Sequence, residues 1–345
     1  PMKGRQIILD HFGAREAAAL MVDGQLHDLL IDADAPRPGT VYRARATKPQ
    51  KGQGGMFLET PDGNAFLKQV KGIAPGDMLT VQLTGYADEG KALPVTTKLM
   101  FKSRYAIVTP DAPGLNISRQ IREDERRDAL MMIAKEEMAG LGFGLILRSS
   151  CEEAEDEDIA EDLRAMVDLA QTVVNDTAAE PETLTEGDGP HVLAWRDWVE
   201  PADVVTDAGS FESHGVLEAL DALREPEVRL AGGASLAIEP TRALIAVDVN
   251  TGADGSFAAG TRANFACAKE LPKQLRLRGL GGQITIDLAP MPKKDRRGFE
   301  ASLRAALKAD GIDTVLAGFT PLGHYELQRK RARLPLNELL SGLLS

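Results

Sequence analysis

Two runs of apolar residues in the second half of the chain each lead into an aspartate. The first run is ALIAVDVNTG, Ala243–Gly252, and the second is QITIDLAPM, Gln283–Met291. Short apolar runs of this kind predict buried strands. Asp248 and Asn250 are two residues apart, so in a strand their side chains leave the same face. We expect Asp287 to lie on a neighbouring strand.

The segment between the two runs, TRANFACAKELPKQLRLRGLGG, predicts a helix. Arg276 and Arg278 stand in its last turn, before glycines that end it. A strand, a helix and a second strand form the unit of a parallel α/β sheet. The apolar residues that fall near helical spacing are Phe265, Ala268, Leu271 and Leu275.

The side chains at the two strand ends suit a hard divalent cation. Asp248, Asn250 and Asp287 offer oxygen ligands, which are the ligands of Mg²⁺ and Mn²⁺ in proteins. Such ions keep several waters and complete their shell with substrate phosphate. For any single aspartate the alternative is a strand-end turn or a helix cap. The joint pattern favours a metal site.

The same region resembles a known family of enzymes. The segment VRLAGGASLAIEPTRALIAVDVNTG, followed by QLRLRGLGGQITIDLAPM, is similar to the catalytic core of the ribonuclease E/G endoribonucleases. MVDGQLHDLLID resembles the opening strands of that family, and VYRARATKPQKGQGGMFLETPDGNAFLK resembles its inserted S1 domain. KALPVTTKL and RYAIVTPDAPGLNISRQI resemble the passage into its 5′-end sensor, and FTPLGHYELQRKRARLPL resembles the close of its catalytic domain.

The resemblance implies a multidomain fold of the mixed α/β (α+β) class. A ribonuclease H-like subdomain is split by an inserted S1 (OB) barrel and a 5′-sensor-like region, and a DNase I-like α/β catalytic domain follows. The expected domains are 1–36 for the first ribonuclease H-like part, 37–99 for the S1/OB domain, 100–198 for the sensor-like region, 199–226 for a reduced second ribonuclease H-like part, and 227–345 for the catalytic domain.

Composition restricts the classes of function. At 345 residues, with 27% charged and 43% hydrophobic residues, the chain predicts about two to four modules with real cores. Two cysteines, Cys151 and Cys267, favour neither a disulfide nor a zinc framework. No run approaches about 18 apolar residues and no signal pattern occurs, so we expect a cytoplasmic protein. The net charge of −12 requires that any RNA surface be a local basic patch.

Such a patch is predicted in the S1-like segment. Aromatic side chains on an OB-type barrel stack on unpaired bases while lysines follow the RNA backbone. The resemblance implies that Phe57, Phe66 and Lys91 face the RNA. The alternative is that one or both phenylalanines fill the barrel core. The basic residues around them are Arg43, Arg45, Lys48, Lys51, Lys68 and Lys71.

An acidic run, CEEAEDEDIAEDL, leads into an apolar pattern that predicts one amphipathic helix from Glu152 to Asp176. Its early carboxylates favour the helix N-terminus. We interpret the acidic face as solvated, with a metal cluster or a docking face as alternatives.

The preceding segment, GFGLILRSS, resembles the strand where the family's Arg-Thr pair grips a 5′-monophosphate. Here Arg148 keeps the guanidinium and Ser149 keeps a hydroxyl. In the segment before Tyr105, which leads to the phosphate pocket, the family has a small glycine, and this chain has Ser103 instead. Glu152 and Glu153 follow the pair and oppose a phosphate by like-charge repulsion. We therefore expect weak 5′-phosphate sensing.

Other positions also depart from the family pattern. The stretch between Trp198 and Phe211 is shorter than its family counterpart, which implies a reduced ribonuclease H-like module. Ala289 replaces a second aspartate, and Pro321 replaces an arginine. No CPxC-type motif occurs, so we expect no zinc and either a monomer or a zinc-independent dimer.

The resemblance implies Mg²⁺-dependent hydrolysis of single-stranded RNA to 5′-phosphate and 3′-hydroxyl products, in RNA processing or decay. Asp248 and Asp287 would bind the metal, and Asn250 would position Asp248 or a bound water. Lys273, Arg276 and Arg278 are candidate phosphate contacts, with stabilisation of the helix C-terminus as the alternative. His324 is a candidate general base, with a surface or core-filling role as the alternative.

Two further functions stay open. One is a catalytically weak or inactive RNA-binding relative, suggested by Ala289 and Pro321. The other is a scaffold with RNA-decay or ribosomal partners, which would use the acidic helix for docking.

Overall fold

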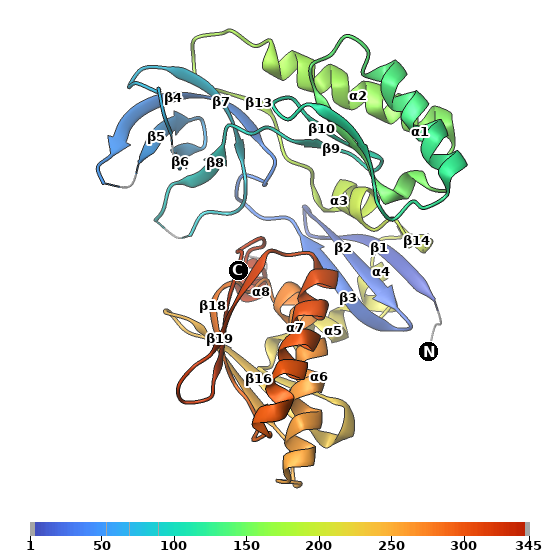
Figure 1. The fold of residues 1–345 in the computed structure, drawn as a ribbon, viewed down its shortest axis with the longest axis vertical. Helices are drawn as coiled ribbons and strands as arrows, with labels where there is room; N and C mark the ends of the chain where they lie inside the picture. The colour runs from blue at the N-terminus through green and yellow to red at the C-terminus, as the bar shows by residue number, and fades with distance from the viewer. Residues whose placement is uncertain (1–3, 53, 69, 89, 342–345) are drawn as a thin grey trace. The chain divides into compact units, whose positions relative to one another are not determined.

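The computed structural model describes residues 4–52, 54–68, 70–88 and 90–341, and Figure 1 shows their course. Residues 1–3, which begin the first expected domain, and residues 342–345, which end the last one, lie outside the described residues. The chain divides into two compact units, Pro1–Asp32 with Ala202–Ser345, and Ala33–Pro201. In the part of the chain that the structure describes, no helix combines the length and the apolar character needed to cross a bilayer.

A closed five-stranded barrel begins the unit Ala33–Pro201, as an S1/OB-like domain would require. Its strands are paired in the order β4-β5-β6-β8-β7, and β4 also pairs with β7, which closes the barrel. Tyr42, Leu58, Ala65 and Val81 fill the interior because alternate residues of each strand point inward. The strands are β4 (Val41–Gln50), β5 (Gly55–Thr60), β6 (Gly63–Leu67), β7 (Met78–Leu83) and β8 (Leu93–Thr96), and β13 (Glu182–Thr185) adds to β4.

The rest of this unit is a second sheet with two helices packed against it (Figure 1). Its strand order is β11-β12-β10-β9. Leu130 of α1 and Leu163 of α2 are buried against the sheet residues Val108 and Leu145. The elements are β9 (Phe101–Lys102), β10 (Ala106–Thr109), β11 (Gly114–Ile117), α1 (Asp124–Glu137), β12 (Gly144–Leu147), η1 (Ser149–Cys151), α2 (Asp156–Val174) and α3 (Pro190–Asp197).

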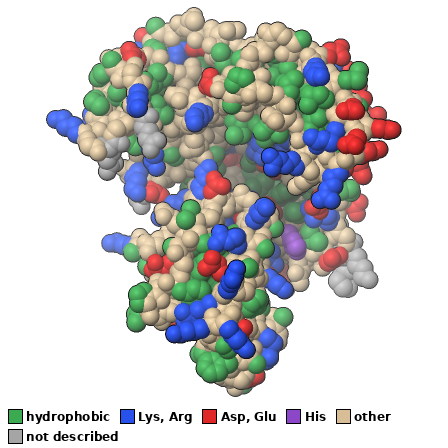
Figure 2. Space-filling model, viewed as in Figure 1, with side chains coloured by type: hydrophobic (Ala, Val, Ile, Leu, Met, Phe, Trp, Pro, Cys, Tyr) green, Lys and Arg blue, Asp and Glu red, His purple; other side chains and the backbone are tan. Residues whose placement is uncertain are grey.

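The predicted amphipathic helix is present as α2, but it is shorter than the expected range from Glu152 to Asp176. A 3-10 turn, η1, ends at Cys151, and the helix begins only at Asp156. Ile159, Leu163 and Val167 form its buried face. Figure 2 shows acidic side chains gathered over the region of α1 and α2, so the acidic face lies on the surface as interpreted.

The other unit begins with three antiparallel strands, and β14 joins β1 in parallel. Ile8, Ala17 and Ala19 of these strands pack against Val216 and Leu220 of α5. The elements are β1 (Arg5–Phe12), β2 (Arg15–Val22), β3 (Gln25–Ile31), β14 (Asp203–Val205), α4 (Ser210–Ser213) and α5 (Val216–Arg224).

The C-terminal part of this unit is a six-stranded sheet in the order β15-β16-β17-β18-β20-β19, and α6 and α7 pack beside it (Figure 1). The predicted parallel pair is confirmed for β17 and β18, which α6 connects. The remaining pairs are antiparallel, so the sheet is mixed. The elements are β15 (Glu227–Arg229), η2 (Ala231–Gly233), β16 (Ser235–Pro240), β17 (Ile245–Asn250), α6 (Phe257–Leu277), β18 (Gly282–Asp287), η3 (Lys293–Asp295), α7 (Arg296–Asp310), β19 (Thr314–Phe319), β20 (Tyr325–Arg329) and α8 (Leu336–Ser341).

The helix α6 starts earlier than the apolar spacing alone indicates. Ser256 caps it, because its Oγ accepts a hydrogen bond from the Ala259 amide at 3.2 Å. The helix ends at Leu277, and Gly279 follows with a positive φ of 64° that favours glycine.

Candidate functional site

Two carboxylates lie side by side where β17 and β18 end. Asp248 and Asp287 are register partners in this parallel pair, so their side chains project from the same face of the sheet. Both are exposed, whereas the preceding residues Val247 and Ile286 are 1% and 0% exposed. The buried strands therefore fix the backbone of the two aspartates and leave their oxygens open to solvent.

This carboxylate pair has no permanently charged cationic partner among the described residues. Asn250 donates a hydrogen bond from Nδ2 to Oδ2 of Asp248 at 3.1 Å, as expected for two side chains on one face. Among the described residues, no lysine or arginine forms an ion pair with Asp248 or Asp287. Two adjacent carboxylates without a counter-charge favour binding of a cation, and an oxygen-only ligand set suits Mg²⁺.

His324 lies beside the second carboxylate. Its Nε2 is 3.6 Å from Oδ1 of Asp287, and its side chain is 37% exposed. The residue precedes β20, whose first residue Tyr325 pairs with Ile286 of β18. The contact of His324 with Asp287 could not be predicted from the sequence, because it depends on this antiparallel pairing between distant segments.

Asn264 on α6 holds the backbone just beyond Asp287, and the sequence analysis missed it. Its Nδ2 donates to the Ala289 carbonyl at 2.8 Å, and its Oδ1 accepts from the Ala289 amide at 2.9 Å. Asn264 is 0% exposed. Gly260, one turn earlier, permits this close approach, because a Cβ there would lie 1.9 Å from the Pro290 carbonyl oxygen. A buried polar residue within an otherwise apolar helix face was the only signal in the sequence.

The two arginines at the end of α6 form ion pairs or hydrogen bonds with other parts of the protein. Arg276 pairs with Asp310 and donates to the His27 carbonyl at 2.6 Å. Arg278 is 8% exposed and donates to the Glu225 carbonyl at 2.7 Å, and burial lowers its pKa. These contacts favour the alternative in which both arginines serve the structure.

The third candidate phosphate contact, Lys273, is partly buried and less committed than the arginines. Its Nζ lies 2.8 Å from Glu270 one turn earlier on α6. A helical pair of this type stabilises a protein only slightly, so RNA can displace it.

A second basic run lies closer to the paired carboxylates in the chain. Lys293 and Lys294 on η3 and Arg297 on α7 are exposed, and η3 is the next helical element after β18. Within the described residues, no carboxylate forms an ion pair with them. Figure 2 shows lysine and arginine side chains gathered around the start of α7. The sequence analysis did not single out this surface, although the run KKDRR was the signal that could have revealed it.

Two aromatic rings lie on the outside of the barrel. Phe57 and Phe66 pair across β5 and β6, with ring centroids 5.1 Å apart. The residues that alternate with them, such as Leu58 and Leu67, fill the core. Lys48 places Nζ 5.5 Å from the Phe57 ring centroid. The outward position rules out the alternative in which both rings fill the barrel.

The remaining basic residues of the barrel are not equivalent. Arg43 is 6% exposed and forms ion pairs with Asp176 at 2.6 Å and Glu182 at 2.8 Å, so it does not belong to the expected basic surface. Lys91 is exposed at 71% of its side chain, with Nζ 2.6 Å from Asp88. An exposed pair of this kind contributes little to stability and can exchange partners.

Arg148, the candidate phosphate ligand of the sensor-like region, is bound by the protein itself. Its Nη1 donates to the carbonyls of Ser103 at 2.6 Å and Arg196 at 2.9 Å. Its Nη2 donates to Oδ1 of Asp197 at 3.1 Å. The Arg148 guanidinium therefore already donates its hydrogen bonds to protein acceptors, and a terminal phosphate would have to replace them.

Asp197 also forms ion pairs with two further basic side chains. Lys102 lies 2.9 Å and Arg196 lies 3.0 Å from its carboxylate. Burial alone would raise the pKa of Asp197, but Arg196 and Lys102 hold the pKa at about 2. Asp197 therefore stays ionised and competes with phosphate for Arg148.

The other expected sensor residues lie around this network. Ser149 begins the turn η1, and Glu152 and Glu153 after it are exposed. Ser103 is buried and donates from Oγ to Asp162 at 2.5 Å. The carboxylate of Asp162 therefore lies beside Ser103, in the segment that would lead to the phosphate pocket.

Both cysteines are free and buried. Cys151 belongs to the core around α1 and α2, and Cys267 belongs to the core under α6. Burial raises the pKa of each thiol to about 12, so neither carries thiolate character at neutral pH.

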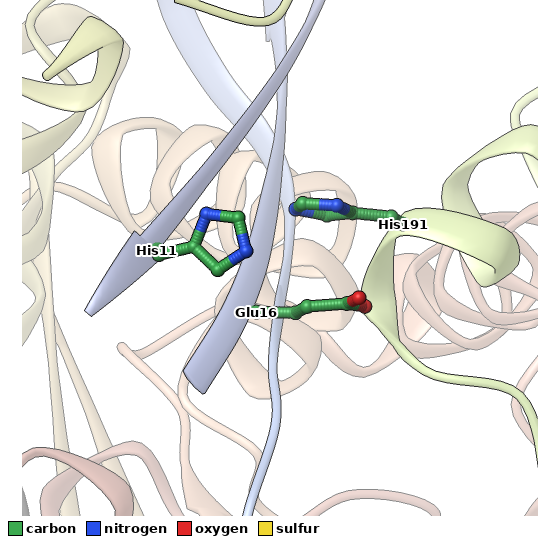
Figure 3. A group of neighbouring side chains, drawn as sticks. All are labelled: His11, Glu16 and His191. Atoms are coloured by element: carbon green, nitrogen blue, oxygen red, sulfur yellow. The ribbon is translucent and has the colours of Figure 1, made fainter. Parts of the chain in front are cut away.

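Figure 3 shows His11 and Glu16 projecting from the paired strands β1 and β2, where they are register partners. His191, labelled in the same view, is the second residue of α3 in the unit Ala33–Pro201. Because these residues belong to separate units, they are not counted as one site.

A mixed α/β structure with a closed five-stranded barrel agrees with the fold that the family resemblance implies. Residues 100–206 and 202–332 match the model of the Ribonuclease E/G family. The chain belongs to this family.

Named relatives agree with this assignment. The chain is 27% identical to Ribonuclease G of Salmonella typhimurium (strain SL1344) over 395 residues, which cover 94% of this chain and 80% of the relative. It is 26% identical to Ribonuclease G of Escherichia coli (strain K12) with the same coverage. It is 25% identical to Ribonuclease E of Synechocystis sp. over 385 residues, which cover 94% of this chain and 56% of the relative.

Proposed function

We propose that the protein is an Mg²⁺-dependent endoribonuclease that hydrolyses single-stranded RNA to 5′-phosphate and 3′-hydroxyl products in RNA processing or decay. The observation that carries this proposal is the in-register pair Asp248 and Asp287, which is exposed and has no lysine or arginine partner among the described residues. Membership of the ribonuclease E/G family supports the choice of RNA as substrate.

Asp248 and Asp287 would hold the Mg²⁺, with Mn²⁺ as an alternative, because both offer carboxylate oxygens on one face. When bound, the ion activates water and neutralises charge on the scissile phosphate. Asn250 fixes the rotamer of Asp248 through its 3.1 Å hydrogen bond. Asn264 fixes the backbone after Asp287 through its two bonds to Ala289.

The protein's own side chains would hold the RNA by two chemistries. On the barrel, Phe57 and Phe66 offer rings for stacking on unpaired bases, and Lys91 offers a cation for the backbone. Beyond Asp287 in the chain, Lys293, Lys294 and Arg297 offer charges without acidic partners among the described residues. We favour this run over Arg276 and Arg278 as the phosphate-contacting surface, and we retain Lys273 as a further candidate.

We also infer the domain assignments from the family. Residues 1–36 and 199–226 would form a reduced ribonuclease H-like subdomain, and residues 37–99 an S1/OB domain. Residues 100–198 would form a sensor-like region, and residues 227–345 a DNase I-like catalytic domain. We further propose a cytoplasmic location, no zinc, a monomer or zinc-independent dimer, and RNA-decay or ribosomal partners.

A second candidate function is RNA binding with weak or no cleavage. Ala289 and Pro321 stand where the resemblance implies an aspartate and an arginine, so the site has lost two of the expected polar groups. This candidate shares the RNA surfaces of the first and differs only in turnover.

The test is incubation of the purified full chain with a fluorescent single-stranded RNA, with Mg²⁺ or with a chelator. The proposal predicts internal cleavage that requires Mg²⁺ and is lost in Asp248→Asn. RNA binding without cleavage at any Mg²⁺ concentration would instead establish the second candidate. Neither binding nor cleavage would reject both.

A further inference from the structure

Trp195 exposes a large aromatic side chain near Arg148. It lies on α3 and is 61% exposed, whereas Trp198, at the end of the same helix, is 9% exposed. Leaving a tryptophan in water forgoes a large gain in burial, and exposed aromatic rings often mark binding surfaces. The exposed ring is therefore the first sign of a site that the catalytic proposal does not use.

Arg104 stacks on this ring. Its guanidinium carbon is 4.0 Å from the Trp195 ring centroid, and its Nη1 donates to the Trp195 carbonyl at 2.5 Å. The guanidinium also lies 5.9 Å from the Tyr105 ring centroid. The hydrogen bond and the cation–π contact fix the two side chains before any ligand arrives, so binding needs little further ordering.

The charge of Arg104 is not compensated, in contrast to that of its basic neighbours. Lys102, Arg148 and Arg196 all bind the Asp197 carboxylate. For Arg104, no carboxylate within ion-pair distance is found in the described ranges of the chain. An anion that approaches this surface therefore meets an available guanidinium at Arg104 and an occupied one at Arg148.

We propose that Arg104 and Trp195 form a binding site for one unpaired nucleotide of single-stranded RNA. The base stacks on the exposed surface of the Trp195 ring, and the adjacent phosphate binds the Arg104 guanidinium. This inference rests on the proposed function, because that function supplies the RNA. The site uses a ring and an internal phosphate, so it does not require a 5′-terminal monophosphate.

Intrinsic tryptophan fluorescence, excited selectively over tyrosine, reports on this site directly, because the chain has two tryptophans and Trp198→Phe leaves Trp195 as the only one. The full chain carrying Trp198→Phe is titrated with a short single-stranded 2′-O-methyl RNA, which resists cleavage. Tryptophan emission and the anisotropy of a dye on the RNA are followed together. A base stacked on Trp195 quenches the emission in parallel with the rise in anisotropy.

Variants in the otherwise unchanged chain give a second, independent measurement by anisotropy alone. Trp195→Ala should weaken RNA binding by about 5- to 150-fold, as loss of one base–aromatic stack does. Trp195→Phe should restore most of the affinity, and Arg104→Gln should weaken binding and flatten its salt dependence. Val192→Ala is the matched control, because Val192 is an exposed apolar residue of the same helix at 50% exposure.

The outcomes separate this inference from the proposed function. RNA binding by anisotropy with unchanged Trp195 emission, and with full affinity in Trp195→Ala, overturns the nucleotide site and leaves the endoribonuclease proposal intact. Absence of any RNA binding overturns both. Equal losses in Val192→Ala and Trp195→Ala would show that a general disturbance of α3, and not stacking, causes the effect, and would also overturn the site.

Discussion

The family resemblance implies a ligand-binding role both for the carboxylates Asp248 and Asp287 and for Arg148, but the structure satisfies the charges of these two regions differently. Asp248 and Asp287 are exposed and have no lysine or arginine partner among the described residues. Arg148 is bonded to Asp197 and to backbone carbonyls. The first region keeps its charge available for a ligand, whereas the second uses its charge to hold the protein together.

This difference shows that a residue of the same type as in the family pattern does not necessarily keep the function that the pattern implies. Hydrogen bonds to charged groups contribute about 1.5–3 kcal/mol each, so a phosphate at Arg148 would have to replace favourable contacts before it gained any. A cation between Asp248 and Asp287 would displace no lysine or arginine of the described residues, and it would relieve repulsion between like charges.

The largest expected effect follows from removing one carboxylate. Asp248→Asn or Asp287→Asn should reduce Mg²⁺-dependent cleavage by about 100-fold or more, because each removes one charged ligand of the proposed ion. Thermal unfolding should stay near that of the unchanged protein, since both side chains are exposed. Initial rates on a fluorescent RNA measure the first quantity and a melting curve the second.

Asp254→Asn is the matched control for this pair. Asp254 lies in the loop after β17, and its ion pair with Arg262 at 3.5 Å is exposed, so the change should leave cleavage almost unaffected. Full activity in both carboxylate variants would remove the paired aspartates from the account.

The next effect concerns the backbone that carries Asp287. Asn264→Leu leaves the buried amide and carbonyl of Ala289 without partners, which should reduce the free energy of unfolding by about 2–5 kcal/mol. Cleavage should also fall at temperatures where the variant is fully folded, because the end of β18 is less well fixed. Asn264→Asp keeps the acceptor for the Ala289 amide, but it buries a carboxylate against the Ala289 carbonyl oxygen and should also lose stability. If urea unfolding gave the same free energy of unfolding for Asn264→Leu and the unchanged protein, the two hydrogen bonds to Ala289 would not contribute to stability.

The barrel face provides a smaller effect on binding. Phe66→Ala should weaken binding of single-stranded RNA by about 1–3 kcal/mol, because one stacking surface is lost. Lys91→Ala should weaken it less and reduce its salt dependence. Leu67→Ala is the control, since Leu67 points into the core and its loss should lower stability instead. A lower melting temperature with unchanged affinity in Phe66→Ala would assign the ring to packing.

The smallest effect is the contribution of Asp197 to stability. Its pKa is held at about 2, below the ordinary value of 3.8, so its contribution is present above about pH 4 and is lost as the pH falls towards 2. At neutral pH, Asp197→Asn should cost about 1–2 kcal/mol after allowance for solvent screening. The difference from the unchanged protein should shrink on acidification. A constant difference from pH 7 to pH 3 would contradict the proposed charge network.

Local patterns in the sequence predicted the elements that carry the carboxylates. Apolar runs that lead into Asp248 and Asp287, and helical spacing between them, depend on residues close in the chain. The structure confirms the parallel pair and α6, and it places Asp248 opposite Asp287.

Contacts between distant segments were not predictable in the same way. Arg148 meets Asp197 from 49 residues away, and Asn264 meets Ala289 from 25 residues away. The alternation of apolar and polar residues says which side of an element is buried, but not which charged side chain of another element will satisfy it. The roles of Arg148, Arg276 and His324 depended on such partners.

One assay compares the two regions directly. Initial cleavage rates are measured with Mg²⁺ on two single-stranded RNAs that differ only in a 5′-monophosphate or a 5′-hydroxyl end. The account predicts cleavage of both, with a ratio of rates near one, because the carboxylate pair is available and Arg148 is already bound by Asp197. Absence of cleavage on both RNAs, or a strong preference for the monophosphate that disappears in Arg148→Ala, would contradict it.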